Sequence, residues 1–115
     1  MKKILIVEDD EQYRKILDEE LTAQGYEVHV ASNGNLALDM LKEGNVDLIL
    51  LDLLMPVMDG VTFYYNLKDK LKLKTPIIVL TNVSDTKAYG ENIKDVLIKS
   101  NVSLKEVIEK VNKYI

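Results

Sequence analysis

The segment Ile4-Leu5-Ile6-Val7-Glu8-Asp9-Asp10 places a run of apolar residues directly before three acidic ones. Continuous rather than alternating apolar character is typical of a strand that is covered on both faces, as in a parallel sheet. Similar short runs, rich in Ile, Leu and Val, recur along the chain at Val28–Ala31, Leu48–Leu51, Ile77–Leu80 and Val96–Ile98. We therefore expect five short strands, the first of which is Ile4–Val7.

Segments with the apolar spacing of amphipathic helices lie between these runs. Four stripes are clear, at Tyr13–Leu21, Leu36–Leu41, Phe63–Leu71 and Leu104–Ile115. The last follows Ser103, which forms a capping-box pattern with Glu106. A further helix, between Ser84 and Asn92, has few apolar residues, and we expect it to be short or irregular. Strands that alternate with helices predict an α/β fold with right-handed crossovers, in one domain over residues 1–115.

The composition is that of an ordinary globular domain and excludes several kinds of protein. Of 115 residues, 19 are acidic and 15 are Lys or Arg, which gives a formal net charge of −4. An acidic chain without a basic cluster lacks the electrostatic footprint of a domain that binds nucleic acid or an anionic membrane. The absence of cysteine excludes disulfides, thiolate metal sites and thiol nucleophiles. The single histidine, His29, lies within a predicted strand, which disfavours catalytic sites built on several histidines.

Targeting and membrane segments are not evident in the sequence. No apolar run reaches the roughly 18–20 residues that a membrane-spanning helix needs. The acidic residues after Val7 also interrupt any signal-peptide core. We therefore expect no membrane association and a cytoplasmic location.

Polar side chains follow four of the five predicted strands, at the carboxyl ends where the working site of an open parallel sheet lies. Glu8 and Asp9 follow the first strand, Asp52 the third, Thr81 the fourth and Lys99 the fifth. Three carboxylates in one crevice stay ionised beside a cation, and a site with few ligands and room for water suits Mg²⁺. A carboxylate can also attack phosphorus, while a Lys and a hydroxyl neutralise the phosphoryl oxygens. The set is therefore complete for forming an aspartyl phosphate.

Each of these residues has a simpler interpretation when it is taken alone. Asp9 or Asp10 would then be a helix N-cap, because helix N-termini favour negative charge. Asp52 would be a turn residue, and Thr81 and Lys99 would be solvated side chains. Only their joint placement at neighbouring strand ends favours a site.

Four motifs carry a resemblance that covers the whole chain: Ile4–Asp10, Leu51-Asp52-Leu53-Leu54-Met55-Pro56-Val57-Met58-Asp59-Gly60, Ile77–Thr81 and Val96–Lys99. The second is the most specific, since an Asp closes an apolar strand and Met-Pro and Met-Asp-Gly follow it. The sequence resembles the receiver domain of bacterial two-component response regulators, in particular the chemotaxis regulators. This resemblance implies a flavodoxin-like, doubly wound sheet of five parallel strands in the order 2-1-3-4-5, with five helices.

The resemblance also implies a role for each candidate site residue. Asp52 is then the phosphoacceptor. The groups that would hold Mg²⁺ are Asp9, Asp52, the backbone carbonyl of Leu54 and, through water, Glu8. Thr81 would hydrogen-bond the phosphoryl group, and Lys99 would pair with it.

The implied function is that of a signalling switch. The domain would accept phosphate from a sensor histidine kinase or a phosphotransfer protein and present a changed surface to an output partner that the sequence does not identify. It would catalyse only its own phosphorylation and dephosphorylation and would not be a metabolic enzyme. One alternative is a receiver-like interaction module that signals without phosphorylation. Another is a phosphatase or mutase with an Asp nucleophile, but that class places a second Asp where this chain has Leu54.

Four features depart from the family pattern. Val96 stands where the family usually has an aromatic switch residue, so an aromatic swing there cannot carry the signal. Ser100 replaces a proline, and we expect the peptide bond before it to be trans, or cis only if its surroundings hold it so. Asn82 replaces a small residue and would either narrow the phosphoryl pocket or donate a hydrogen bond into it. Thr81 and Lys99 are only 18 residues apart, so the segment between them is short.

Two further positions bear on the lifetime of the phosphoryl group. Leu54 and Val83 flank the expected path of a hydrolytic water. Both side chains are apolar and cannot position water. We therefore expect a long-lived phosphoryl group.

Overall fold

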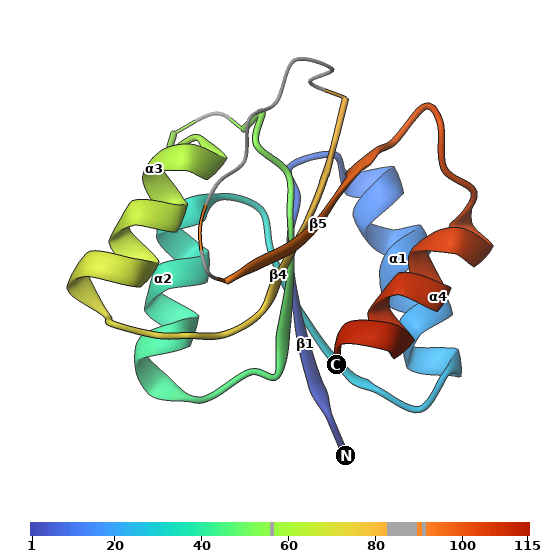
Figure 1. The fold of residues 1–115 in the computed structure, drawn as a ribbon, viewed down its shortest axis with the longest axis horizontal. Helices are drawn as coiled ribbons and strands as arrows, with labels where there is room; N and C mark the ends of the chain where they lie inside the picture. The colour runs from blue at the N-terminus through green and yellow to red at the C-terminus, as the bar shows by residue number, and fades with distance from the viewer. Residues whose placement is uncertain (56, 83–89, 91) are drawn as a thin grey trace.

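The computed structural model describes residues 1–115 except 56, 83–89 and 91 (Figure 1). Strands and helices alternate along the chain, as the apolar pattern predicts. The elements are β1 Lys3–Val7, α1 Glu11–Ala23, β2 Glu27–Ala31, α2 Gly34–Glu43, β3 Leu48–Leu51, α3 Gly60–Tyr65, a π-helical turn η1 Asn66–Lys70, β4 Ile77–Thr81, β5 Ile93–Ile98 and α4 Leu104–Tyr114.

The five strands form one parallel sheet in the order β2-β1-β3-β4-β5, which confirms the predicted topology. Helices α1 and α4 lie on one side of the sheet, and α2 and α3 lie on the other (Figure 1). Each side has its own core, because successive strand residues point to opposite faces. Ile4 and Ile6 pack with α1 and α4, whereas Leu5 and Val7 pack with α2 and α3.

Burial on both faces explains the continuous apolar runs. Every residue of β3 and β4 is buried, and so is β1 after its first residue. Burying one Ile or Leu side chain is worth roughly 1.5–3 kcal/mol, so the buried side chains of these three strands stabilise the sheet. The edge strands β2 and β5 are only partly buried, which matches their mixed polar and apolar sequences.

Three strands, β1, β2 and β4, differ from the sequence prediction by one residue at one end, and two elements differ by more. β5 begins at Ile93 rather than at Val96, because an edge strand tolerates the polar Lys94 and Asp95 that precede the apolar run. The stripe Phe63–Leu71 forms α3 and then a π-helical turn rather than one α-helix. In that turn the Leu71 amide donates to the carbonyl of Asn66, five residues earlier.

The expected helix between residues 84 and 92 falls almost entirely on residues 83–89 and 91, outside the described part of the chain. Within the described residues there are four α-helices where five were expected for the whole chain. In that same part of the chain, no helix is both long and apolar enough to cross a bilayer.

Side-chain caps begin the helices next to the strand ends. Asp10 caps α1 by accepting from the amides of Gln12 and Tyr13, and Asp59 caps α3 by accepting from the amide of Thr62. The predicted capping box of Ser103 and Glu106 is present at the start of α4. Because Asp10 directly follows Glu8 and Asp9, the start of α1 is fixed beside them.

Gly60 allows α3 to begin against the backbone that follows β3. A Cβ atom on Gly60 would lie 2.6 Å from the Cα of Leu53 and 2.8 Å from the carbonyl oxygen of Asp52. Neither backbone atom can move away without shifting the end of β3. Glycine at this position therefore keeps α3 close to Asp52.

We expect Gly60→Ala to lower the free energy of unfolding by about 1–3 kcal/mol, because overpacking against backbone forces a shift. Urea denaturation measures the change. Gly44→Ala is the matched control, because Gly44 has an extended backbone and a Cβ atom added to it would have no other atom within 4 Å. Equal stability of Gly60→Ala and the wild type would contradict this account.

Candidate functional site

The carboxyl ends of β1, β3, β4 and β5 meet at one edge of the sheet. The amide of Asp52 donates to the carbonyl of Val7 at 3.1 Å, which joins β3 to β1. The amide of Lys99 donates to the carbonyl of Thr81 at 2.9 Å, which joins β5 to β4. The residues that follow these strands are therefore neighbours in space, although they are far apart in the sequence.

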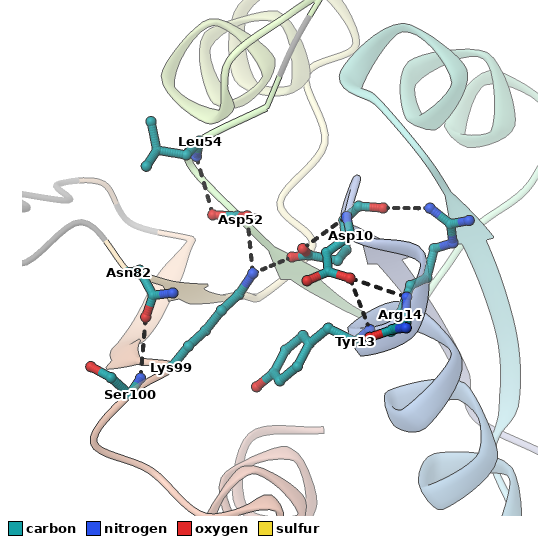
Figure 2. A network of polar contacts seen from close by, with 10 residues as sticks. Asp10, Tyr13, Arg14, Asp52, Leu54, Asn82, Lys99 and Ser100 are labelled. Carbon is teal, nitrogen blue, oxygen red and sulfur yellow. Dashed lines mark hydrogen bonds and ion pairs between the residues drawn. The ribbon is translucent and has the colours of Figure 1, made fainter.

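Lys99 connects two buried carboxylates at this edge. Its Nζ lies 2.7 Å from Oε2 of Glu8 and 3.1 Å from Oδ2 of Asp52. Figure 2 shows the Lys99 side chain reaching from the end of β5 toward Asp52. Glu8 and Asp52 are 2% and 6% exposed, and the Lys99 side chain is 13% exposed. Two buried negative charges therefore share one positive charge.

This imbalance changes the proton affinity of the site. Burial raises the pKa of Glu8 to about 7, and the charge of Asp52 adds to the rise, while the hydrogen bond from Lys99 opposes it. Burial alone would lower the pKa of Lys99. Its hydrogen bonds and ion pairs with Glu8 and Asp52 outweigh burial, so the pKa of Lys99 lies above its ordinary value.

Asp9 adds a third carboxylate at the mouth of the site. Carboxylate oxygens of Glu8, Asp9 and Asp52 lie within 4.8 Å of one another, and Asp9 is exposed whereas the other two are buried. Oxygen ligands of this kind suit a hard divalent cation, and a cation would relieve the excess negative charge. The donor set therefore fits Mg²⁺, the cation that the resemblance implies.

The segment after β3 orients Asp52. Its Oδ1 accepts a hydrogen bond from the amide of Leu54 at 3.1 Å, while Oδ2 faces Lys99 (Figure 2). The Leu54 side chain is largely exposed. Val57, two residues before the cap Asp59, has a positive φ of 72°. Both oxygens of Asp52 are thus held by groups from different parts of the chain.

Thr81 is the last residue of β4 and is fully buried. It is paired with Ile98, the last residue of β5, directly before Lys99. The structure therefore brings the predicted hydroxyl and the predicted ammonium to adjacent strand ends. Val83 lies outside the described residues.

Asn82 and Ser100 contact each other. The side-chain oxygen of Asn82 accepts a hydrogen bond from the amide of Ser100 at 3.2 Å (Figure 2). This oxygen thus faces the chain after β5. A proline at position 100 would have no amide hydrogen to donate, so the two departures from the family pattern complement each other. The peptide bond before Ser100 is trans, as predicted.

Two residues of α1 belong to the site although no motif in the sequence points to them. Nη1 of Arg14 donates to the carbonyl of Glu8 at 2.9 Å, and the Tyr13 ring lies beside Lys99 (Figure 2). The apolar spacing of the first helix includes Tyr13 but indicates only packing for it. His29, by contrast, is exposed on β2 and hydrogen-bonds to Glu27.

Comparison with known proteins identifies the family. The family model described as the response regulator receiver domain matches residues 4–112. The transcriptional regulatory protein SrrA of Staphylococcus aureus is 34% identical over 113 residues, which covers 95% of this chain and 46% of that protein. The chain thus spans about half the length of the curated relatives that it matches.

Solved structures agree with the family model. The response regulator TrrA of Thermotoga maritima, in a complex with Mg²⁺ and BeF, is 36% identical with a TM-score of 0.87, and the match covers 100% of both chains. The chemotaxis protein CheY4 of Vibrio cholerae is 28% identical with a TM-score of 0.88, covering 100% of this chain and 99% of that one. With its sheet order and its acidic strand ends, the chain belongs to the family of response regulator receiver domains.

Proposed function

We propose that residues 1–115 act as a Mg²⁺-dependent phosphoacceptor switch, in which Asp52 takes a phosphoryl group from a phosphohistidine. The donor would be a sensor histidine kinase or a phosphotransfer protein. The observation that carries this proposal is the shared ammonium: Lys99 binds both Glu8 and Asp52, and the acidic Asp9 lies beside them. The chain would not act as a metabolic enzyme.

The proposed reaction is a transfer to one oxygen of Asp52. The carboxylate attacks phosphorus, a P–O bond forms, the P–N bond to the donor histidine breaks, and the imidazole leaves with the bond's electron pair. Lys99 would neutralise charge on the phosphoryl oxygens, and the Thr81 hydroxyl would donate a hydrogen bond to one of them.

The acidic residues would hold the metal. Asp9, Asp52 and the backbone carbonyl of Leu54 are the proposed direct ligands, and Glu8 would reach the ion through water. Mg²⁺ would neutralise negative charge on the attacking carboxylate and on the phosphoryl group. Support comes from the three carboxylates that lie within 4.8 Å of one another and from the relative TrrA, whose structure contains Mg²⁺ and BeF.

Phosphorylation would change the charge around Lys99 and bias the surface near β4 and β5 toward an output partner. We propose a protein partner, because the acidic composition gives this domain no footprint for nucleic acid. A second candidate, an interaction module that signals without phosphorylation, is favoured by Val96, which is aliphatic and packs against the core under α2 and α3. A phosphatase is disfavoured because Leu54 supplies no second carboxylate.

Incubation with a small phosphoramidate and Mg²⁺ should add the mass of one phosphoryl group to the intact protein. Asp52→Asn should add none, because an amide is not a nucleophile toward phosphorus. The control is Asp59→Asn, because Asp59 is exposed in the same loop and Asn also caps helices. An unmodified wild type would favour the interaction module, and equal modification of Asp52→Asn would contradict the assignment of Asp52.

The stability of the metal-free protein should fall as the pH rises from about 4.5 to about 7. The pKa of Glu8 is raised in the folded state, so the folded protein binds more protons than the unfolded chain across this window. Over this pH window the free energy of unfolding falls by at most about 3 kcal/mol. Saturation with Mg²⁺ should remove this slope and, at ~100 times its Kd, add about 2.7 kcal/mol.

Urea denaturation at several pH values measures this effect. Glu8→Gln preserves the shape of the side chain and should make the unfolding free energy flat over the same range. The same slope in Glu8→Gln as in the wild type would show that another group titrates. Identical midpoints with Mg²⁺ and with chelator would contradict the metal site.

The phosphoryl group should persist well beyond seconds, because the exposed Leu54 side chain cannot orient an attacking water. Leu54→Gln supplies an amide that can, and we expect faster release of radiolabelled phosphate from the isolated phosphoprotein. Val61→Gln changes a comparably exposed apolar residue on α3 and is the control. Loss of label from the wild type within seconds would overturn this prediction.

A further inference from the structure

Lys99 has a third neighbour besides its two carboxylates. Its Nζ lies 4.7 Å from the centroid of the Tyr13 ring. Tyr13 belongs to the first turn of α1, whereas Lys99 follows β5 at the other end of the chain. In Figure 2 the ring lies alongside the extended Lys99 side chain, on the side away from Leu54. An aromatic face and an ammonium at this distance attract each other.

The surroundings strengthen this attraction. The Lys99 side chain is 13% exposed, and cation–π contacts gain strength when water is excluded. Tyr13 is itself held in place, because it packs against the core between α1, α4 and the sheet. Lysine is otherwise a flexible residue with a point charge, so a fixed ring restricts where the ammonium can go.

The ring differs from the other two partners because it carries no charge. Glu8 and Asp52 both belong to the acidic cluster that a divalent cation would engage. A cation that draws Glu8 away from Lys99 would remove the shorter of its two ion pairs, at 2.7 Å. The Tyr13 ring is uncharged and would not be drawn to the cation, so its contact with Lys99 would persist.

We propose that Tyr13 is a positioning residue, whose ring keeps the Lys99 ammonium beside Asp52 when the cation engages the carboxylates. This inference rests on the proposed function for its effect on phosphorylation, but the contact between ring and ammonium is testable without phosphate. The ring face and not the hydroxyl is the contacting group. The proposal therefore predicts that phenylalanine at position 13 preserves the contact with Lys99 and that an aliphatic residue there loses it.

Three variants test the proposal. Tyr13→Phe keeps the ring, whereas Tyr13→Leu and Tyr13→Met keep an apolar side chain without a ring. With a small phosphoramidate and Mg²⁺, we expect Tyr13→Phe to be phosphorylated within about twofold of the wild-type rate. Tyr13→Leu and Tyr13→Met should be about three- to tenfold slower, the loss of one cation–π contact. Thermal midpoints report whether each variant is folded, and the Met variant serves if the Leu variant does not fold.

A second measurement needs no phosphodonor. Ring currents should shift the NMR signals of the Lys99 Cε protons upfield in the wild type and in Tyr13→Phe, before and after Mg²⁺ is added. In Tyr13→Leu this shift should be absent. If the wild type takes no phosphoryl group, the proposed function fails, while the NMR signals with and without Mg²⁺ still decide whether Tyr13 holds Lys99.

Tyr114→Leu is the matched control. The Tyr114 ring lies 5.1 Å from Nζ of Lys113 and packs against the same core as Tyr13, but it is on α4 and has no part in the acidic site. Its loss should lower the thermal midpoint and leave the phosphorylation rate unchanged. The proposal is overturned if folded Tyr13→Leu reacts at the wild-type rate, if Tyr13→Phe slows as much as Tyr13→Leu, or if the Lys99 signals do not differ between them.

Discussion

Two buried carboxylates share one ammonium, and the other properties of the site depend on that shortage of positive charge. Lys99 contacts both Glu8 and Asp52, so one negative charge is left uncompensated before Asp9 is counted. Buried charges are costly unless they are paired, and the raised pKa of Glu8 is the result of that cost. A site in this condition gains stability from a proton or from a cation. The uncompensated negative charge that weakens the fold would therefore also favour the proposed binding of a divalent cation.

The fold supplies the contacts that keep this arrangement together. Glu8 and Lys99 are 91 residues apart, and Asp52 and Lys99 are 47 apart, so only the sheet brings them into contact. Gly60 then allows α3 to lie close to the carbonyl of Asp52, and Asp10 fixes the start of α1 beside Glu8. The close contact at Gly60 and the helix cap at Asp10 would contribute little to the site in an isolated helix or strand. They matter because they hold the ends of buried strands.

Three residues that depart from the family pattern, Asn82, Val96 and Ser100, make contacts that the structure shows directly. Ser100 provides an amide hydrogen, and Asn82 accepts it, so the loop after Lys99 is joined to the end of β4. Val96 packs against the core under α2 and α3, on the face opposite to the Tyr13 side of the sheet. The aromatic ring next to Lys99 belongs to Tyr13 of α1. The aromatic neighbour of this lysine is therefore supplied by a distant part of the chain.

The sequence by itself determined the class of fold, the strand order through its family resemblance, and the set of residues at the strand ends. The continuous apolar runs at Ile4–Val7 and Leu48–Leu51 require burial on both faces. The parallel sheet that they predict is therefore the one that the structure has. The start of β5 and the π-helical turn after α3 could not be predicted, because edge exposure and helix packing decide them. The contacts of Tyr13 and of Asn82 were decided by tertiary structure alone. A ring in an apolar stripe and an amide after a strand acquire partners only when the sheet places Lys99 and Ser100 beside them.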